Sequence, residues 1–276
     1  MTALFIVIGG VFGAVIGSFL NVVIYRVPLK KSIAFPASAC PHCGHAIASY
    51  DNIPVISWLV LRGRCRYCSA PISIRYPIVE LGTALFFALV IAVFLPGLLA
   101  TGSTAALIAA ILAIVAFLYL AAISVALAFI DLENFRLPNV IVLPAYAVGA
   151  ILLVASSLLA GDPFQLTRAA IGAAALFGLY FLLAIVYPGG MGFGDVKLAG
   201  VLGLYLAWVG WGELVVGGFG AFVLGGIFGV VLLIFRSAGR KSRIPFGPWM
   251  ILGAWIGILW GGDISDWYLA LFGLNG

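Results

Sequence analysis

Two aspartates are the side chains best suited to chemistry in this chain. Asp131 ends a long apolar stretch in the sequence Phe-Ile-Asp131-Leu-Glu, and Asp195 closes the sequence Gly-Phe-Gly-Asp195. Ionisable groups at membrane depth are costly and usually functional. Two carboxylates that meet there share one proton, which provides one acid and one base for the attack of water on a peptide bond.

Each aspartate also has a purely structural interpretation. Asp131 could be a solvated carboxylate at a helix end, and Asp195 could be the N-cap of the next helix, with Gly192 and Gly194 shaping the turn. The pair taken together favours chemistry, because Gly-x-Gly-Asp allows a substrate strand to approach the backbone closely. Lys197 is either a snorkelling residue at the membrane interface or a local charge partner.

Four cysteines form two Cys-x-x-Cys pairs, Cys40-Pro-His-Cys43 and, 21 residues later, Cys65-Arg-Tyr-Cys68. This spacing is typical of a tetrahedral thiolate site for Zn²⁺, and four cysteines leave no open position for catalysis at the metal. Disulfides or redox cysteines are the alternative if the segment faces an oxidising compartment. His42 and His45 are interpreted as surface histidines rather than ligands.

The composition is that of an integral membrane protein. Hydrophobic residues make up 64% of the chain and charged residues 8%, with a mean hydropathy of +1.25. The apolar runs are continuous rather than alternating, which predicts an all-α polytopic fold. We expect about eight transmembrane helices, of which the sixth and eighth are short and rich in glycine; the spans lie near 3–25, 78–96, 104–130, 138–159, 168–187, 196–211, 213–235 and 247–261.

The basic residues indicate the orientation of these spans. They concentrate between the first and second spans and between the seventh and eighth, as Arg26, Lys30, Lys31, Arg62, Arg64, Arg66 and Arg75, and as Arg236, Arg240, Lys241 and Arg243. With eight spans both segments lie on one side, which the positive-inside rule places in the cytoplasm, with both termini outside. The net charge of +5 is therefore a topology signal, and we expect no nucleic-acid partner.

The chain divides into three predicted parts. Residues 1–26 form the first transmembrane helix, residues 27–77 a small cytoplasmic loop domain, and residues 78–276 the transmembrane core that contains both aspartates. The loop domain is too short to bury a large core, so the four-cysteine zinc site would have to hold it together.

Several motifs, taken together and in order, resemble those of the bacterial type IV prepilin peptidases. They are Gly17-Ser-Phe-Leu-Asn21-Val-Val-Ile-Tyr-Arg26-Val-Pro28, Cys-Pro-His-Cys, Tyr50-Asp-Asn-Ile-Pro54-Val-Ile-Ser-Trp58, Arg62-Gly-Arg-Cys, Arg75-Tyr-Pro-Ile-Val-Glu80, Asp131 with Leu137-Pro138, Gly190-Met-Gly-Phe-Gly-Asp195-Val-Lys197, and Ile244-Pro-Phe-Gly-Pro248. Many relatives carry an acid after Leu-Pro, where this chain has Asn139.

The resemblance implies an inner-membrane aspartic peptidase of the Gly-x-Gly-Asp class. Asp131 and Asp195 match the family's catalytic pair, and Gly192, Gly194 and Lys197 lie in the same active-site loop. Such an enzyme cleaves the basic leader from prepilins or type II secretion pseudopilins at the cytoplasmic face, while the substrate helix stays in the bilayer.

Family members with the full cysteine loop commonly also N-methylate the new terminus, using S-adenosylmethionine. The resemblance therefore implies that residues 27–77 take part in methyl transfer. Candidate contacts to the cofactor or substrate are Gly17, Asn21, Arg26 and Glu80. Glu80 could hold a substrate amine or a loop arginine, or it could simply be a carboxylate near a helix N-terminus, where the dipole favours it.

Three other hypotheses compete with a bifunctional enzyme. The chain could be a leader peptidase without methyl transfer. It could be a proton-coupled transporter that uses Asp131 and Asp195 as a relay, although no paired halves are visible in the sequence. It could also be a non-enzymatic scaffold with a zinc loop that serves pilus assembly.

Overall fold

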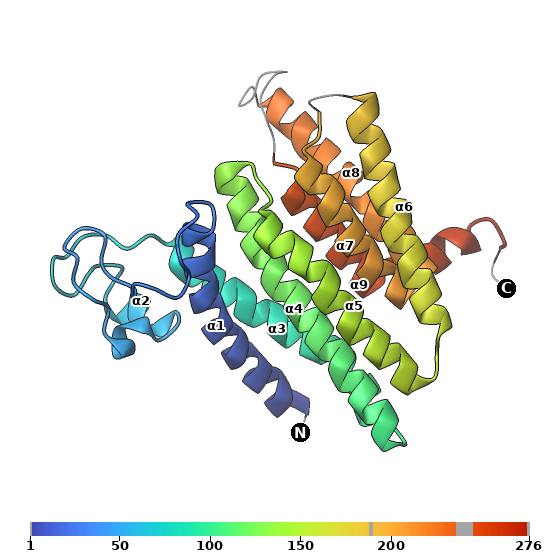
Figure 1. Ribbon diagram of the computed structural model, residues 1–276, viewed down its shortest axis with the longest axis horizontal. Coiled ribbons are helices and arrows are strands. Elements are labelled where there is room, and N and C mark those ends of the chain that lie inside the picture. Colours follow the sequence, from blue (N-terminus) through green and yellow to red (C-terminus); the bar gives the residue numbers. More distant parts are fainter. Residues whose placement is uncertain (1, 188–189, 236–244, 275–276) are drawn as a thin grey trace. The chain divides into compact units, whose positions relative to one another are not determined.

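A computed structural model describes residues 2–187, 190–235 and 245–274 of the chain. Among these residues it contains helices and turns but no strand, which confirms the predicted all-α class (Figure 1). The elements are α1 (Thr2–Arg26), η1 (Ser49–Asn52), α2 (Ile56–Val60), α3 (Arg75–Leu99), α4 (Thr104–Asn134), α5 (Asn139–Ala160), α6 (Phe164–Val186), α7 (Phe193–Val209), α8 (Trp211–Ile234) and α9 (Gly247–Ala270).

The predicted count of eight membrane spans is approximate. Eight long helices occupy the predicted positions, and six of them within the described residues are long and apolar enough to cross a membrane, namely α1, α3, α4, α5, α6 and α8. The other two, α7 and α9, correspond to the sixth and eighth spans, which were predicted to be short and rich in glycine. Helix α7 has 17 residues and therefore a length of about 25 Å.

Three helix ends differ from the prediction in ways that matter for the site. Helix α4 continues to Asn134, so Asp131 lies in its last turn rather than after it. Helix α7 begins at Phe193, so Asp195 is its third residue and Gly192 is the N-cap; the alternative, structural interpretation of Asp195 as the N-cap is therefore wrong. Helix α9 runs to Ala270 and not to residue 261.

The chain forms two compact units. The first contains Met1–Thr101 and Phe117–Ala126, and the second contains Gly102–Ala116 and Leu127–Gly276, so α4 contributes to both. The second basic segment of the prediction, with Arg236, Arg240, Lys241 and Arg243, lies outside the described residues, as do Pro188 and Gly189.

In the first unit, α1 and α3 pack against each other through glycines of α1. A Cβ atom added at Gly13 would lie 2.7 Å from the Cβ of Phe87, and one added at Gly17 would lie 2.7 Å from the Cα of Glu80. Any larger residue at these positions would push the helices apart. Small residues at such intervals are how membrane helices approach closely, since dispersion contacts replace the hydrophobic effect in lipid.

The second unit is built around α7, which is buried along most of its length and packs against α5, α6, α8 and α9. Close approach again depends on glycine, because a Cβ at Gly172 of α6 would lie 2.6 Å from the carbonyl oxygen of Gly203. Arg168 of α6 donates to the carbonyl oxygens of Ala207, Trp208 and Val209, the last three residues of α7. This arginine therefore caps the C-terminus of α7. The capping role explains why a basic residue occurs here, far in sequence from both basic segments.

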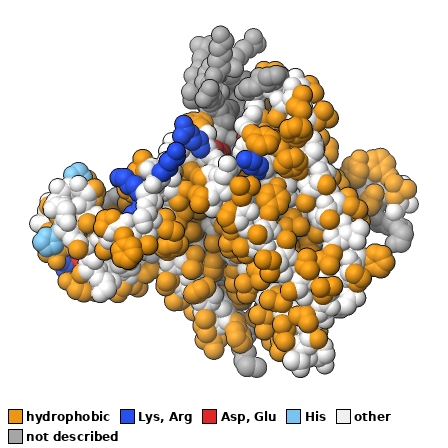
Figure 2. Space-filling view, in the orientation of Figure 1, with side chains coloured by type: hydrophobic (Ala, Val, Ile, Leu, Met, Phe, Trp, Pro, Cys, Tyr) orange, Lys and Arg blue, Asp and Glu red, His pale blue; other side chains and the backbone are white. Residues whose placement is uncertain are grey.

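The outer faces of the helices are apolar, as Figure 2 shows for one side of the protein. On α1, for example, Leu4, Val7 and Val11 each expose more than half of their surface. In an aqueous protein such faces would be a liability, whereas lipid makes them favourable. The fold is therefore that of a multi-pass membrane protein.

The packing at Gly172 gives a matched test within one helix. We expect Gly172→Ala to lower the melting temperature of the purified protein, because overpacking a tight contact costs about 1–3 kcal/mol. Gly178→Ala is the control, since a Cβ there meets no atom within 4 Å. That variant should melt at or slightly above the wild-type temperature, because alanine favours helix by up to about 1 kcal/mol. Identical melting of the two variants would contradict the close α6–α7 contact.

Candidate active site and metal site

The four cysteines lie together in the first unit. Their Sγ atoms all lie within 4.8 Å of one another, and those of Cys40 and Cys68 are 3.8 Å apart. In a tetrahedron with metal–sulfur bonds of about 2.3 Å, neighbouring sulfurs are about 3.8 Å apart. The cluster could therefore hold a metal ion, and its donor set and dimensions fit zinc.

The backbone turns bring the sulfurs together in two similar knuckles. The N–H of Gly44 donates to the carbonyl oxygen of Cys40, and the N–H of Ser69 donates to that of Cys65, each at 2.9 Å. Gly44 and Ser69 both adopt a positive φ, which closes the turn after each Cys-x-x-Cys pair. His45 stacks on Tyr67 with ring centroids 3.8 Å apart, which agrees with its interpretation as a non-ligand.

The thiols affect one another electrostatically. Hydrogen bonds from the backbone N–H groups of Cys43 and His42 lower the pKa of Cys40 to about 6. For Cys68, the N–H of Ala70 also favours the thiolate, but burial and hydrogen bonds shared with the other three cysteines raise its pKa to about 12. Four thiolates cannot coexist in this space at neutral pH unless a cation neutralises them.

Glu80 of α3 fastens the cysteine loop to the helices. Its side chain is 8% exposed, and Oε2 accepts a 2.7 Å hydrogen bond from the backbone N–H of Val55. Val55 has a φ of +61°, which is unfavourable for a β-branched residue. The Glu80 carboxylate thus holds a strained loop residue. The sequence had suggested a substrate amine or a loop arginine as its partner, and the structure shows a backbone N–H instead.

Asn21 and Gly17 lie on the same α1–α3 interface as Glu80. Asn21 is 3% exposed, and its Nδ2 donates to the carbonyl oxygen of Tyr76 at 3.1 Å. Its Oδ1 is buried and has no hydrogen-bond donor among the described residues. Gly17 provides the space for Glu80, so it has a clear packing role whatever else it does.

Arg26 organises the chain just after α1. Its guanidinium donates to the carbonyl oxygens of Ser32 and Pro36, at 3.0 and 2.7 Å. A second arginine, Arg66, forms an ion pair with Asp51, and its hydrogen bonds lower the pKa of that carboxyl. The loop is therefore held by the cysteine knuckles, by Glu80 and by these two arginines.

Asp131 lies buried at the end of α4 in the second unit, with 5% of its surface exposed. Its Oδ2 accepts a 3.0 Å hydrogen bond from the backbone N–H of Gly247, the first residue of α9. A Cβ at Gly247 would lie 2.8 Å from the same oxygen, so only glycine leaves room for this contact. The N-terminus of α9 carries a positive dipole end, which stabilises a carboxylate placed there.

Asp195 is held in the same way by its own helix. Its Oδ2 accepts a 3.0 Å hydrogen bond from the N–H of Gly192, while its own N–H donates to the carbonyl oxygen of Gly192. The Asp195 carboxylate thus supplies the side-chain half of a capping box at the start of α7, and the backbone carbonyl of Gly192 accepts in place of an N-cap side chain. Asp195 remains half-buried, so one side of the carboxylate stays accessible.

The structure brings the two aspartates together. Their charges are close enough for electrostatic repulsion, and Leu137 packs against Gly194 and Gly247, the glycines next to the two carboxylates. Added Cβ atoms at Gly194 and Gly247 would lie 3.0 and 3.2 Å from Leu137. Figure 1 shows the end of α4 and the starts of α7 and α9 at one end of this unit. Sequence reasoning assigned no role to Gly247, although Ile-Pro-Phe-Gly-Pro was a visible signal.

Lys197 points to a neighbouring helix. Its Nζ donates to Oδ1 of Asn139 at 3.0 Å and lies 4.8 Å from the centre of the Phe193 ring. Asn139 is the first residue of α5. The lysine thereby links the starts of α5 and α7 beside the aspartates.

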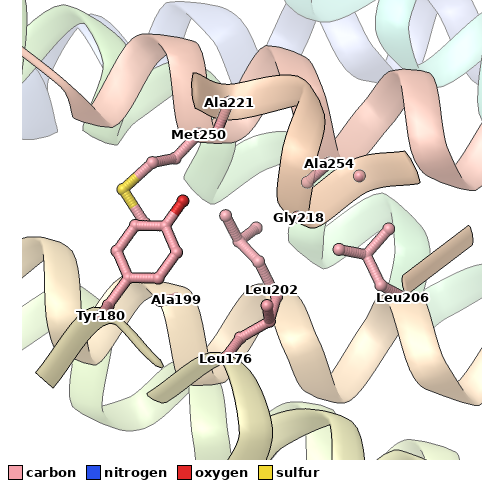
Figure 3. Close-up of a pocket in the computed structure, with 10 residues that line it drawn as sticks. Leu176, Tyr180, Ala199, Leu202, Leu206, Gly218, Ala221, Met250 and Ala254 are labelled. Carbon is pink, nitrogen blue, oxygen red and sulfur yellow. The ribbon is translucent and has the colours of Figure 1, made fainter. Parts of the chain in front are cut away.

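A small apolar cleft lies between α6, α7, α8 and α9. Figure 3 shows Tyr180 and Met250 at one end, with Leu202 and Leu206 farther along. Tyr180 lies within electrostatic reach of Asp195, so the cleft begins near the carboxylates.

Fold and site together define a helical membrane protein with a paired-aspartate centre and a separate four-cysteine site. Two family models match the chain: "Bacterial Peptidase A24 N-terminal domain" over residues 11–94, and "Type IV leader peptidase family" over residues 118–230. The chain belongs to this bacterial leader peptidase family. The resemblance inferred from the motifs is thereby confirmed, and a transporter or a scaffold is disfavoured.

Similar proteins support the same conclusion. A protein from Aeromonas hydrophila named "Prepilin leader peptidase/N-methyltransferase" is 38% identical, covering 95% of this chain and 92% of the relative. Proteins of the same name from Pseudomonas putida and Myxococcus xanthus are 35% and 41% identical, covering 98% and 74% of this chain and 96% and 57% of the relatives. No solved structure matches the chain. Family and apolar helices together indicate a multi-pass protein of the inner membrane.

We expect one zinc ion per chain, bound by Cys40, Cys43, Cys65 and Cys68. Replacing Cys40 or Cys65 with serine should abolish zinc binding and open the loop to proteases, because metal binding supplies on the order of 10 kcal/mol in small zinc modules. His42→Ala is the control and should keep its zinc, since His42 is not part of the sulfur cluster. Elemental analysis and limited proteolysis measure both effects; disulfides in place of zinc would refute the assignment.

Proposed function

We propose that this chain is a bifunctional enzyme that removes the leader from type IV prepilins or type II secretion pseudopilins and N-methylates the new terminus. The observation that carries the peptidase half is the convergence of Asp131 and Asp195, each held by a helix N-terminus. The curated relatives carry both activities in their name. The intact four-cysteine cluster favours the bifunctional enzyme over a peptidase alone.

The two aspartates divide the work of hydrolysis. One carboxylate takes a proton from water, and the resulting hydroxide attacks the carbonyl carbon of the scissile bond. The other carboxyl donates its proton to the leaving nitrogen, which releases the leader with a new carboxylate and the mature chain with a new amine. The N–H groups of Gly247 and Gly192 fix both carboxylates before the substrate arrives, so little reorganisation is needed.

The surroundings suit a membrane-embedded substrate. Exposed Gly192 and half-buried Gly194 leave backbone where an extended strand could pair beside Asp195. We place this end of the second unit at the cytoplasmic face of the inner membrane, where the two aspartates would attract a basic leader. Both termini would then lie outside.

Methyl transfer is assigned to the first unit. Bound S-adenosylmethionine would supply the methyl group. Asn21 Oδ1, which is buried without a donor among the described residues, and the Glu80 carboxylate are two acceptors on one interface. Such acceptors fit a cationic cofactor or a substrate amine. Structural zinc holds the loop of residues 27–77 in place, Gly17 keeps α1 close to Glu80, and Arg26 holds the start of the loop.

Neutralising either aspartate should abolish cleavage. We expect Asp131→Asn and Asp195→Asn each to lose many orders of magnitude in rate, because an acid and a base that act as a unit fail together. Asp266→Asn is the control, since Asp266 is exposed near the end of α9. The measurement is mass spectrometry of prepilin incubated with each purified variant. Near-normal cleavage by either active-site variant would exclude the shared-proton mechanism.

Gly247 should be needed to position Asp131. Gly247→Ala places a methyl group against Oδ2 and should reduce cleavage on the order of 10²-fold, the effect typical of a misplacement of about 1 Å. Because the loss comes from misplaced chemistry, kcat should fall while KM stays nearly constant. Gly226→Ala is the control, as a Cβ there meets no atom within 4 Å. Equal activity of the two variants would argue against this positioning role.

The two activities should be separable. Asp195→Asn enzyme given an already mature pilin should still transfer a methyl group, because methyl transfer needs a cofactor pocket and a free amine rather than the aspartates. Damage to the loop around Tyr50–Arg66 should reduce methylation more than cleavage. Mass spectrometry of the pilin N-terminus reads both activities. Parallel loss in loop variants, or no methylation by Asp195→Asn enzyme, would contradict two sites.

A further inference from the structure

The short helix α2 turns its apolar face outward. Ile56, Leu59 and Val60 follow the i, i+3, i+4 spacing that places side chains on one helix face, and they are 58%, 60% and 70% exposed. Ser57, one residue further round the helix, is buried, and its Oγ donates to the carbonyl oxygen of Tyr50 in the loop. A soluble module of this size would place such a face in its own core, so this surface needs a partner.

The depth of α2 follows from its attachment to α3. The N–H of Val55, the N-cap of α2, donates to Glu80, which is five residues from the start of α3. Five residues rise about 7.5 Å along a helix, and all 25 residues of α3 extend about 37 Å, close to the 40–45 Å of a whole bilayer. The start of α2 therefore lies at the depth where amphipathic helices bury their apolar faces, about 5–10 Å into the interface.

The neighbouring side chains match a membrane interface. Ile78 and Leu81 of α3, within two residues of Glu80 in sequence, are each 50% exposed, so apolar side chains also face outward at this level of α3. Lys30 and Lys31 follow the end of α1, and Arg62 follows α2; all three are exposed. Residues 27–77 contain six basic side chains and one acidic one, and such segments beside a membrane helix attract anionic headgroups.

We propose that the cysteine loop is docked on the bilayer, with Ile56, Leu59 and Val60 inserted among the lipids and Lys30, Lys31 and Arg62 contacting anionic phospholipid headgroups. The loop is then a membrane-seated platform rather than a freely moving appendage. Glu80 and the bilayer hold it from two sides. A substrate whose helix lies in the same membrane would meet the loop without leaving the lipid surface.

Photocrosslinking in lipid nanodiscs tests this docking directly. A photoreactive amino acid replaces Leu59, and the full chain is placed in discs of mixed anionic and zwitterionic phospholipid without prepilin. The same probe at Tyr67 is the matched control, because Tyr67 is 52% exposed and stacks on His45 of the other knuckle. Figure 2 shows the histidines at the outer edge of the module.

We expect phospholipid adducts at position 59 in several-fold excess over position 67. Equal yields at both positions, or crosslinks from position 59 to peptides of residues 127–276, would overturn the proposal; the second result would mean that the chain's other unit covers α2. The probe at Ile56, on the same face, must behave as at Leu59. Zinc content, measured on each sample, shows that the loop is folded.

The contact between the lysines and anionic headgroups can be tested separately. In the same discs, adducts at position 59 should favour the anionic lipid, and the double change Lys30→Gln with Lys31→Gln should reduce that preference while total lipid adducts persist. Glutamine keeps the length and polarity of these exposed side chains, so the fold should be unaffected. Adducts that mirror the bulk lipid composition in the unaltered protein would refute the headgroup contact.

Discussion

A carboxylate that is kept from water needs hydrogen-bond donors from the protein, and much of this structure can be understood from that requirement. Asp131 and Asp195 come from different helices, and each receives a backbone N–H at a helix N-terminus, from Gly247 and from Gly192. These donors cannot rotate away, and the helix dipoles add favourable potential at both points. The start of α9 must therefore lie beside the end of α4, and this requirement constrains the packing of the second unit.

The same solution appears in the first unit with a different consequence. There Glu80 receives the N–H of Val55, so a buried acid ties a loop to a membrane helix. Glycines make both arrangements possible, because Gly17 brings α1 against Glu80 and Gly247 brings α9 against Asp131. In both units a glycine thus lets a neighbouring helix approach a buried carboxylate closely. The four thiols present the equivalent problem for sulfur, which a bound cation would resolve.

Much of this organisation was predictable from sequence. Continuous apolar runs gave the helices, and the Cys-x-x-Cys spacing gave the sulfur cluster, because both signals are local. Helix ends were less predictable, since α4 continues past Asp131 and α7 starts before Asp195 through capping geometry that apolar patterns do not encode. The contacts of Gly247, Leu137 and Asn139 depend on tertiary packing across more than 50 residues of chain, so the motifs marked these residues without revealing their partners.

Two chemically different sites in two compact units imply an order of events, because the amine to be methylated exists only after the leader is cut. A time course with purified enzyme in lipid, prepilin substrate and mass spectrometry of the product tests this most directly. With S-adenosylmethionine withheld, the account predicts full leader removal and an unmethylated mature pilin, which gains one methyl group once the cofactor is added. Failure to cleave without the cofactor, or a methylated prepilin that still carries its leader, would contradict it.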